Sequence, residues 1–186
     1  MSREAALRRH SVRIGLAAAA LFLAATARAA DGANVEEIVN YVRVSDAVST
    51  GGQPTMPQVM ALGQAGFRAV LNLREDSEFD APAEAQAAAD ARLVYIRIPV
   101  QGSDPRDGEA EEFLRVTDDR SHDPIFIHCA SGNRVGAFWL IRRVLRDGYT
   151  FEDAAAEAAR IGLKSQGLTD FARRYVDAHR GGERTP

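Results

Sequence analysis

One strand–loop–helix stretch, residues 124–145, constrains the fold of this chain more than any other feature of its sequence. The apolar run at residues 124–127 is rich in β-prone side chains and predicts a buried strand. The apolar run from Val135 to Leu145 is too long for a strand and predicts a mostly buried helix. The residues between them, His128-Cys129-Ala130-Ser131-Gly132-Asn133-Arg134, therefore form a tight loop that leads into a helix.

This loop holds the only cysteine of the chain, Cys129. Backbone N–H groups at a helix N-terminus face such a loop, and the helix dipole favours negative charge there, so the attacking thiolate is favoured. Gly132 permits the bend, and Arg134 offers a planar fork of donors that Lys would replace poorly. We expect a reactive cysteine in an anion cradle, and we favour anion binding by Arg134 over an internal salt bridge.

The rest of the chain predicts strands alternating with helices, which implies a mainly parallel central sheet flanked by helices, an α/β fold. Residues 74–82 predict a charged loop, and residues 83–91 an Ala-rich helix. Ligands of such sheets bind at the carboxyl ends of the strands. We therefore expect the polar residues that follow the strands to lie near the Cys129 loop.

The His-Cys…Arg loop resembles the signature of the cysteine-dependent phosphatase superfamily. The nearest branch comprises bacterial dual-specificity-phosphatase-like proteins related to the phosphatase-like domain of β-lactamase-hydrolase-like proteins. The resemblance covers roughly residues 40–178 and implies a dual-specificity-phosphatase fold. Its further landmarks, in the family's order, are Thr50-Gly51-Gly52-Gln53-Pro54, Ala65-Gly66-Phe67, Val70-Leu71-Asn72-Leu73-Arg74 and Ile98-Pro99-Val100.

The resemblance implies a role for each candidate site residue. Cys129 is the nucleophile, and the general acid belongs on the loop after Val100, where Asp104 is the best-placed candidate and Asp107 the second. Asp104 could equally serve only in a turn. His128 and Asn72 support the loop. The residues expected to bind substrate, besides Arg134, are Ala130, Ser131, Gly132, Asn133, Gln53 and Arg74.

Four of these residues also have a simpler explanation. Gln53 and Asn72 could hold loops together by side-chain-to-backbone bonds, and for both we favour that role. Arg74 could attract a second anionic group or be solvated. His128 could be a core histidine bonded to backbone.

Two departures from the phosphatase signature keep other functions open. Cys129 and Arg134 are separated by four residues where the phosphatase signature has five, and four is the spacing of the rhodanese loop. Val135 stands where many phosphatases have Ser or Thr. The leading hypothesis is a phosphatase that hydrolyses a phosphomonoester of a protein or small metabolite through a phosphocysteine. The alternatives are a rhodanese-type sulfurtransferase with a Cys129 persulfide, and a non-catalytic oxyanion-binding or redox-sensing module.

Residues 1–29 predict a secretory signal peptide. Arginines at the start precede an apolar stretch from Ile14 to Ala27 that is too short to cross a bilayer of about 30 Å, and Ala27-Arg28-Ala29 offers a cleavage site. We expect export, to the periplasm, by the Sec or the twin-arginine route, with no stable membrane anchor after cleavage. Removal of five arginines and one glutamate would move the formal charge from −3 to −7.

This acidic balance argues against nucleic acid as a partner. One cysteine and scattered histidines lack the ligand spacing of zinc sites, so we expect neither metal nor other cofactor. A length of 186 residues suits one domain. We place a lead-in at 30–40, the phosphatase-like domain at 41–179 and a disordered tail at 180–186; the sequence does not indicate an oligomeric state.

Overall fold

The computed structural model describes residues 33–180, so the predicted signal peptide and residues 181–186 of the predicted tail lie outside the described part. Within this described part, five strands form one sheet in the order β1-β2-β5-β3-β4. β1 is antiparallel to β2, and the other neighbours are parallel. The predicted α/β fold with a mainly parallel central sheet is confirmed. The strands are β1 (Val42–Arg43), β2 (Val48–Gly51), β3 (Ala69–Asn72), β4 (Val94–Arg97) and β5 (Ile125–His128).

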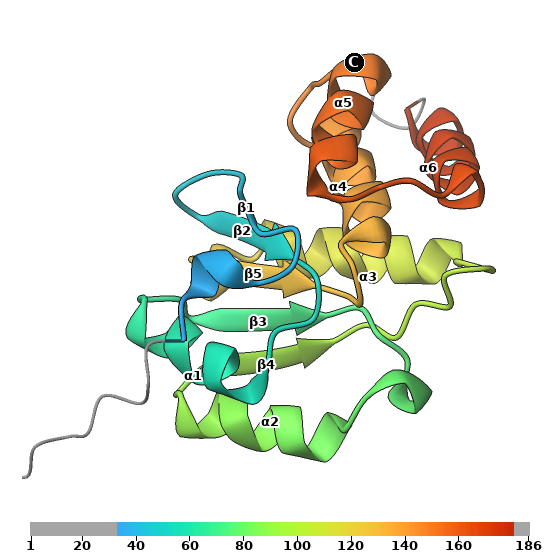
Figure 1. Cartoon of the computed structure of the whole chain (residues 1–186). Helices are drawn as coiled ribbons and strands as arrows, with labels where there is room; N and C mark the ends of the chain where they lie inside the picture. The colour runs from blue at the N-terminus through green and yellow to red at the C-terminus, as the bar shows by residue number, and fades with distance from the viewer. Residues whose placement is uncertain (1–32, 181–186) are drawn as a thin grey trace, which may run out of the picture.

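Helices cover both faces of this sheet (Figure 1). α1 and α2 lie on one face, and α3 to α6 on the other. The short 3₁₀ helices of residues 33–180 are η1 (Val35–Glu37), η2 (Asp76–Glu78) and η3 (Arg120–His122). The α-helices are α1 (Met56–Gln64), α2 (Ala81–Asp90), α3 (Asp107–Asp118), α4 (Asn133–Leu145), α5 (Phe151–Ile161) and α6 (Gln166–His179).

Successive side chains of the central strands point to opposite faces of the sheet, so each strand contributes to the hydrophobic core on both faces. In β3, Val70 packs with α1 and α2, whereas its neighbour Leu71 packs with the larger helical layer on the opposite face. In β5, Phe126 and Ile127 divide in the same way. Both strands are therefore buried on both sides, which explains their continuous apolar runs.

The ordered structure extends into the segment predicted as a lead-in. Ile38 is buried in the core beneath α1 and α2, and the Val39 carbonyl accepts a hydrogen bond of 2.6 Å from Gly52 N. None of the described helices is long and apolar enough to cross a membrane.

The register of the parallel strands brings their carboxyl ends together. His128 pairs with Gly51 of β2 and with Asn72 of β3, and Asn72 pairs with Arg97 of β4. The loops that leave these strands therefore meet at one edge of the sheet, next to Cys129.

Candidate functional site

The Cys129 loop is as short as the sequence predicts. β5 ends at His128 and α4 begins at Asn133. Gly132 is the N-cap of α4 with φ of +84°, and a Cβ there would overlap the carbonyl oxygen of Ile161. Both the left-handed backbone and the close approach of that carbonyl require glycine here.

Contacts from outside the loop hold it in place. Gln53 N donates to the Ala130 carbonyl (3.2 Å), and the Asn40 side chain donates to the Ser131 carbonyl (2.8 Å). The side-chain oxygen of Asn133 accepts from Lys164 N (2.9 Å) and from Ser165 N (3.2 Å). The loop backbone is therefore positioned by the N-terminal segment and by the α5–α6 connection.

Cys129 is buried and borders a hollow of about 320 Å³, which we call the Cys129 hollow. Of the loop residues predicted to bind substrate, Ser131, Asn133 and Arg134 line it. The other residues that line it are Glu75, Glu78, Gly102, Ser165 and Leu168.

Arg134 makes an internal ion pair, the alternative to the anion binding that its place in the sequence favours. Its Nη1 and Nη2 each donate to one carboxylate oxygen of Glu78 at 2.6 Å, and Nη1 also donates to the Val100 carbonyl at 2.9 Å. This bond lowers the pKa of Glu78 to about 2. Burial acts to lower the pKa of Arg134, but its bonds to Glu78 and its interaction with the nearby Cys129 raise it.

His128 meets a carboxylate instead of the backbone partner considered from the sequence. Its Nε2 lies 3.0 Å from Oε1 of Glu84, and both side chains are fully buried. Gln53 Nε2 donates to Glu84 at 2.6 Å, Asn72 Nδ2 at 3.0 Å and the Tyr95 hydroxyl at 3.1 Å.

These contacts set the pKa values of Glu84 and of Tyr95. Burial acts to raise the pKa of Glu84, but the bonds from His128, Gln53 and Tyr95 together hold it below its ordinary value. Burial, together with the charge of Glu84, raises the pKa of Tyr95. Glu84 is therefore a buried carboxylate that is stabilised in its ionised form by hydrogen bonds.

Arg74 is buried, so the alternative that it is solvated is wrong. Its Nη1 donates to Gln53 Oε1 at 2.5 Å, and its Nε lies 3.6 Å from Glu78 Oε2. Arg74 N donates to Asn72 Oδ1 at 2.8 Å, which is the loop-holding role expected for Asn72. A continuous series of side-chain contacts thus joins the two ends of the loop: His128, Glu84, Gln53, Arg74, Glu78, Arg134.

Gln53, Asn72 and Arg74 do not line the Cys129 hollow. Asp104, the predicted general acid, is exposed and lines an adjoining hollow of about 390 Å³ that shares Glu75 with the Cys129 hollow. Asp107 is the exposed first residue of α3. Among the described residues, the carboxylates that line the Cys129 hollow are those of Glu75 and Glu78, neither of which is among the residues predicted from the sequence.

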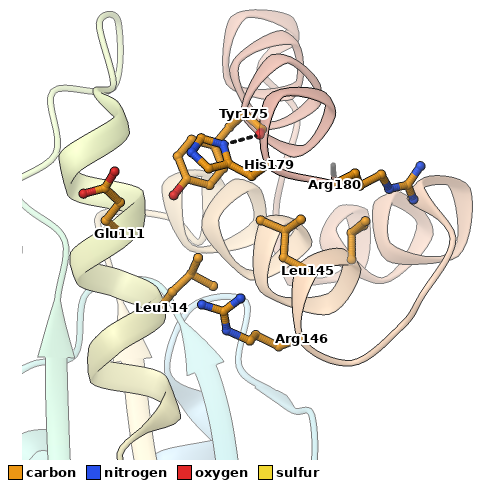
Figure 2. A pocket seen from close by; sticks show the side chains of 8 residues that line it. Glu111, Leu114, Leu145, Arg146, Tyr175, His179 and Arg180 are labelled. Atoms are coloured by element: carbon orange, nitrogen blue, oxygen red, sulfur yellow. Dashed lines mark hydrogen bonds between the residues drawn. The ribbon is translucent and has the colours of Figure 1, made fainter. Parts of the chain in front are cut away.

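Another hollow, also about 390 Å³, lies between α3, α4 and α6 (Figure 2). Leu114, Leu145 and Tyr175 contribute to it, and the ring of Tyr175 stacks on His179 at 4.0 Å between centroids. Leu145 is twelve residues along α4 from Asn133, which places this hollow about 18 Å from the start of the helix. Within residues 33–180, no group of three or more His, Cys, Asp or Glu side chains could hold a metal ion.

Comparison with known sequences gives one family and three curated relatives. The model of the family described as "DSP-PTPase phosphatase fused to NAD+ Kinase" matches residues 27–169. A β-lactamase hydrolase-like protein of Xylella fastidiosa is 28% identical over 111 residues, which are 58% of this chain and 26% of the relative. The Agrobacterium fabrum protein of the same name is 27% identical over 108 residues, 56% of this chain and 25% of the relative. The chain thus matches only about a quarter of the length of these relatives.

Solved structures share the fold. A phosphatase-like protein (DUF442) of Shewanella putrefaciens is 24% identical, with a TM-score of 0.65 over 77% of this chain and 95% of that chain. The core catalytic domain of the PP-IP phosphatase SIW14 of S. cerevisiae is 16% identical, with a TM-score of 0.66 over 76% and 88%. TpbA of P. aeruginosa, in complex with pTyr, is 18% identical, with a TM-score of 0.61 over 81% and 95%.

Proposed function

We propose a cysteine-dependent phosphatase activity for this chain, which belongs to the DSP-PTPase phosphatase family whose model matches residues 27–169. The observation that carries the proposal is the placement of Cys129 beside Arg134, at the N-terminus of α4, on the border of an open hollow. A thiolate, a guanidinium and backbone amides at a helix start are the groups that phosphoryl transfer to cysteine requires.

In this mechanism the Cys129 thiolate attacks phosphorus, and water later hydrolyses the phosphocysteine. Arg134 and the loop amides hold the non-bridging oxygens, and a stronger grip on the transition state than on the substrate supplies the rate. Because both Nη atoms of Arg134 already bind Glu78, the phosphoryl group must share the guanidinium with Glu78 or displace it.

The proposed substrate is a phosphomonoester on a protein or a small metabolite. One protein that shares the fold was solved with pTyr, a phosphomonoester, and another is named a PP-IP phosphatase, which supports a phosphorylated small molecule as the wider substrate class. Export to the periplasm through the leader at residues 1–29 remains part of the proposal, and it would restrict the substrates to that compartment.

A second candidate is a rhodanese-type sulfurtransferase. The observations that favour it are the four residues between Cys129 and Arg134 and the prior pairing of Arg134 with Glu78, since a short loop around a single sulfur atom needs fewer oxyanion contacts. The Cys129 thiolate would attack the outer sulfur of thiosulfate and form an S–S bond as sulfite leaves. An acceptor such as cyanide would then remove that sulfur and return the thiolate.

The deciding experiment compares the protein from Ala30 onward with its Cys129→Ser variant on two substrates in parallel. An aryl phosphate reports phosphate release, and thiosulfate with cyanide reports thiocyanate. Thermal melting of both proteins controls for folding. Phosphate release that the Cys129→Ser variant loses supports the proposal; thiocyanate formation that the variant loses supports the sulfurtransferase.

If neither phosphate nor thiocyanate is formed, both proposed activities are contradicted. If vanadate nevertheless protects Cys129 from alkylation, the remaining hypothesis is a non-catalytic oxyanion-binding module. A phosphatase activity that is fully retained by Cys129→Ser overturns the mechanism outright.

A further inference from the structure

The proposed phosphatase needs a proton donor for the leaving oxygen, and the Cys129 hollow offers two carboxyl groups. These are Glu75 and Glu78, on the loop that follows β3. The hydroxyl groups that line the hollow, on Ser131 and Ser165, are too weakly acidic for this task.

Glu78 has no position for the required proton. Each of its carboxylate oxygens accepts a bond of 2.6 Å from Arg134, and Oε1 also accepts from Glu75 N at 2.9 Å. The bond to Arg134 lowers the pKa of Glu78 to about 2, so this carboxylate stays ionised even at an acidic pH where an ordinary glutamate gains its proton. Glu78 therefore holds the arginine and does not donate a proton.

Asp104 lies outside the Cys129 hollow. The loop that carries it contributes Gly102 to the hollow, but Asp104 lies two residues further on, exposed, in the adjoining hollow. Its backbone N closes a turn on the Gln101 carbonyl at 3.0 Å. In this arrangement Asp104 does not border the position of the phosphoryl group.

Glu75 lines both hollows, so it lies where they meet. In an in-line displacement the leaving oxygen points away from the attacking sulfur, toward the opening of the site. Glu75 is half-buried and anchored through its own N–H to Glu78, and no ion pair to its carboxylate occurs within residues 33–180. From this geometry we infer, on the basis of the proposed phosphatase function, that Glu75 is the general acid and base of the reaction.

The reaction then balances with water as the only further reactant. Cys129 sulfur forms a bond to phosphorus, the bond from phosphorus to the ester oxygen breaks, and that oxygen takes the proton of the Glu75 carboxyl group. The Glu75 carboxylate next removes a proton from water, whose oxygen attacks phosphorus. The phosphorus–sulfur bond breaks, sulfur regains its electron pair as a thiolate, and phosphate leaves.

The test uses leaving groups that differ in their need for a proton. We would measure kcat/KM, which reports the first chemical step, for phosphotyrosine and for dinitrophenyl phosphate with Glu75→Gln, Asp104→Asn and the exposed control Glu152→Gln. Glu75→Gln is expected to lose about 10²–10⁴-fold on phosphotyrosine, the typical contribution of a general acid, and much less on dinitrophenyl phosphate. Added formate should restore part of the phosphotyrosine activity of Glu75→Ala.

Several results would overturn the inference while the phosphatase proposal stands. One is Cys129-dependent turnover that Glu75→Gln leaves unchanged. A second is an equal loss on both esters, which indicates a structural role, and a third is a leaving-group-dependent loss in Asp104→Asn only. If the wild-type protein releases no phosphate from either ester, the proposed function fails and the role of Glu75 fails with it.

Discussion

Glu84 and Glu78 anchor the two ends of the same loop, in opposite surroundings. Glu84 faces His128 and is fully buried, with four polar partners from four different segments. Glu78 faces Arg134, retains 26% of its side-chain exposure and borders the hollow that a substrate would enter. Both carboxylates have a lowered pKa, but only Glu78 can exchange its partner for a ligand.

Because of this difference, one end of the loop serves mainly the stability of the fold and the other end serves mainly ligand binding. When a buried carboxylate loses its partners, it cannot form hydrogen bonds to water instead. The same holds for partners that lose their carboxylate, so either change lowers the free energy of unfolding. A partly exposed ion pair contributes little to folding because water replaces it readily. We therefore expect changes at the His128 end to reduce stability and changes at the Arg134 end to alter anion binding and turnover.

The largest expected effect is the loss of stability in Glu84→Ala. The change leaves Gln53, Asn72 and Tyr95 without their buried acceptor, and we expect the free energy of unfolding to fall by about 3–5 kcal/mol. Denaturation with urea measures it. Glu84→Gln, which keeps the volume and one acceptor oxygen, should lose less, and a loss below about 1 kcal/mol in Glu84→Ala would show that the network is not stabilising.

At the other end of the loop, Arg134→Lys should leave stability nearly unchanged and reduce kcat/KM by about 10²–10³-fold, or about 2.7–4 kcal/mol of transition-state stabilisation. The reason is that an ammonium group can pair with Glu78 but cannot present the planar fork to two oxygens. Phosphate release by the variant and by the wild-type protein measures the effect. Activity within tenfold of wild type would mean that Arg134 acts only as a positive charge.

Much of this arrangement was predictable from the sequence because it is local. Residues 124–145 contain two apolar runs of different length. A strand buried on both faces and a buried helix are both continuously apolar, so the length of each run distinguishes the strand from the helix, and the loop lies between them. The proximity of Cys129 and Arg134 follows from the tightness of the loop between them. The role of Asn72 in holding a loop also follows, because the bond from Arg74 N to its side-chain oxygen spans only two residues of the chain.

The partners of the loop were harder to predict because they come from distant segments. Glu84 carries a usable signal, since it shares the buried face of an Ala-rich helix with Ala87 and Ala88, where a lone carboxylate needs polar partners. Glu78 carries none: it lies 56 residues from Arg134, among other acidic residues of a charged loop. The position of Asp104 in the adjoining hollow likewise depends on how its loop packs, which residue spacing does not determine.

A smaller effect is expected from Glu78→Gln on the binding of oxyanions. The change removes a negative charge beside the Cys129 hollow and frees Arg134 for a ligand, so vanadate should bind about fivefold more tightly, which corresponds to about 1 kcal/mol. Protection of Cys129 from alkylation by graded vanadate measures the affinity, with Glu152→Gln as the control. Weaker binding would mean that Glu78 is needed to aim Arg134 at the anion.

The smallest expected effect is the pH dependence of the Arg134–Glu78 pair. Because the pKa of Glu78 falls from an ordinary 4.5 to about 2 in the folded protein, the unfolded chain takes up a proton in this range that the folded protein does not. The pair therefore contributes its full stability above about pH 4.5 and loses it as the pH falls toward 2.

Glu78→Gln lacks this titration, whereas Glu84 titrates in both proteins. The stability difference between wild type and Glu78→Gln, measured with urea from about pH 6 down to about pH 3, should stay constant to about pH 4.5 and shrink below it. A constant difference would show that Glu78 titrates alike in the folded and unfolded chain, and that the ion pair contributes nothing to folding.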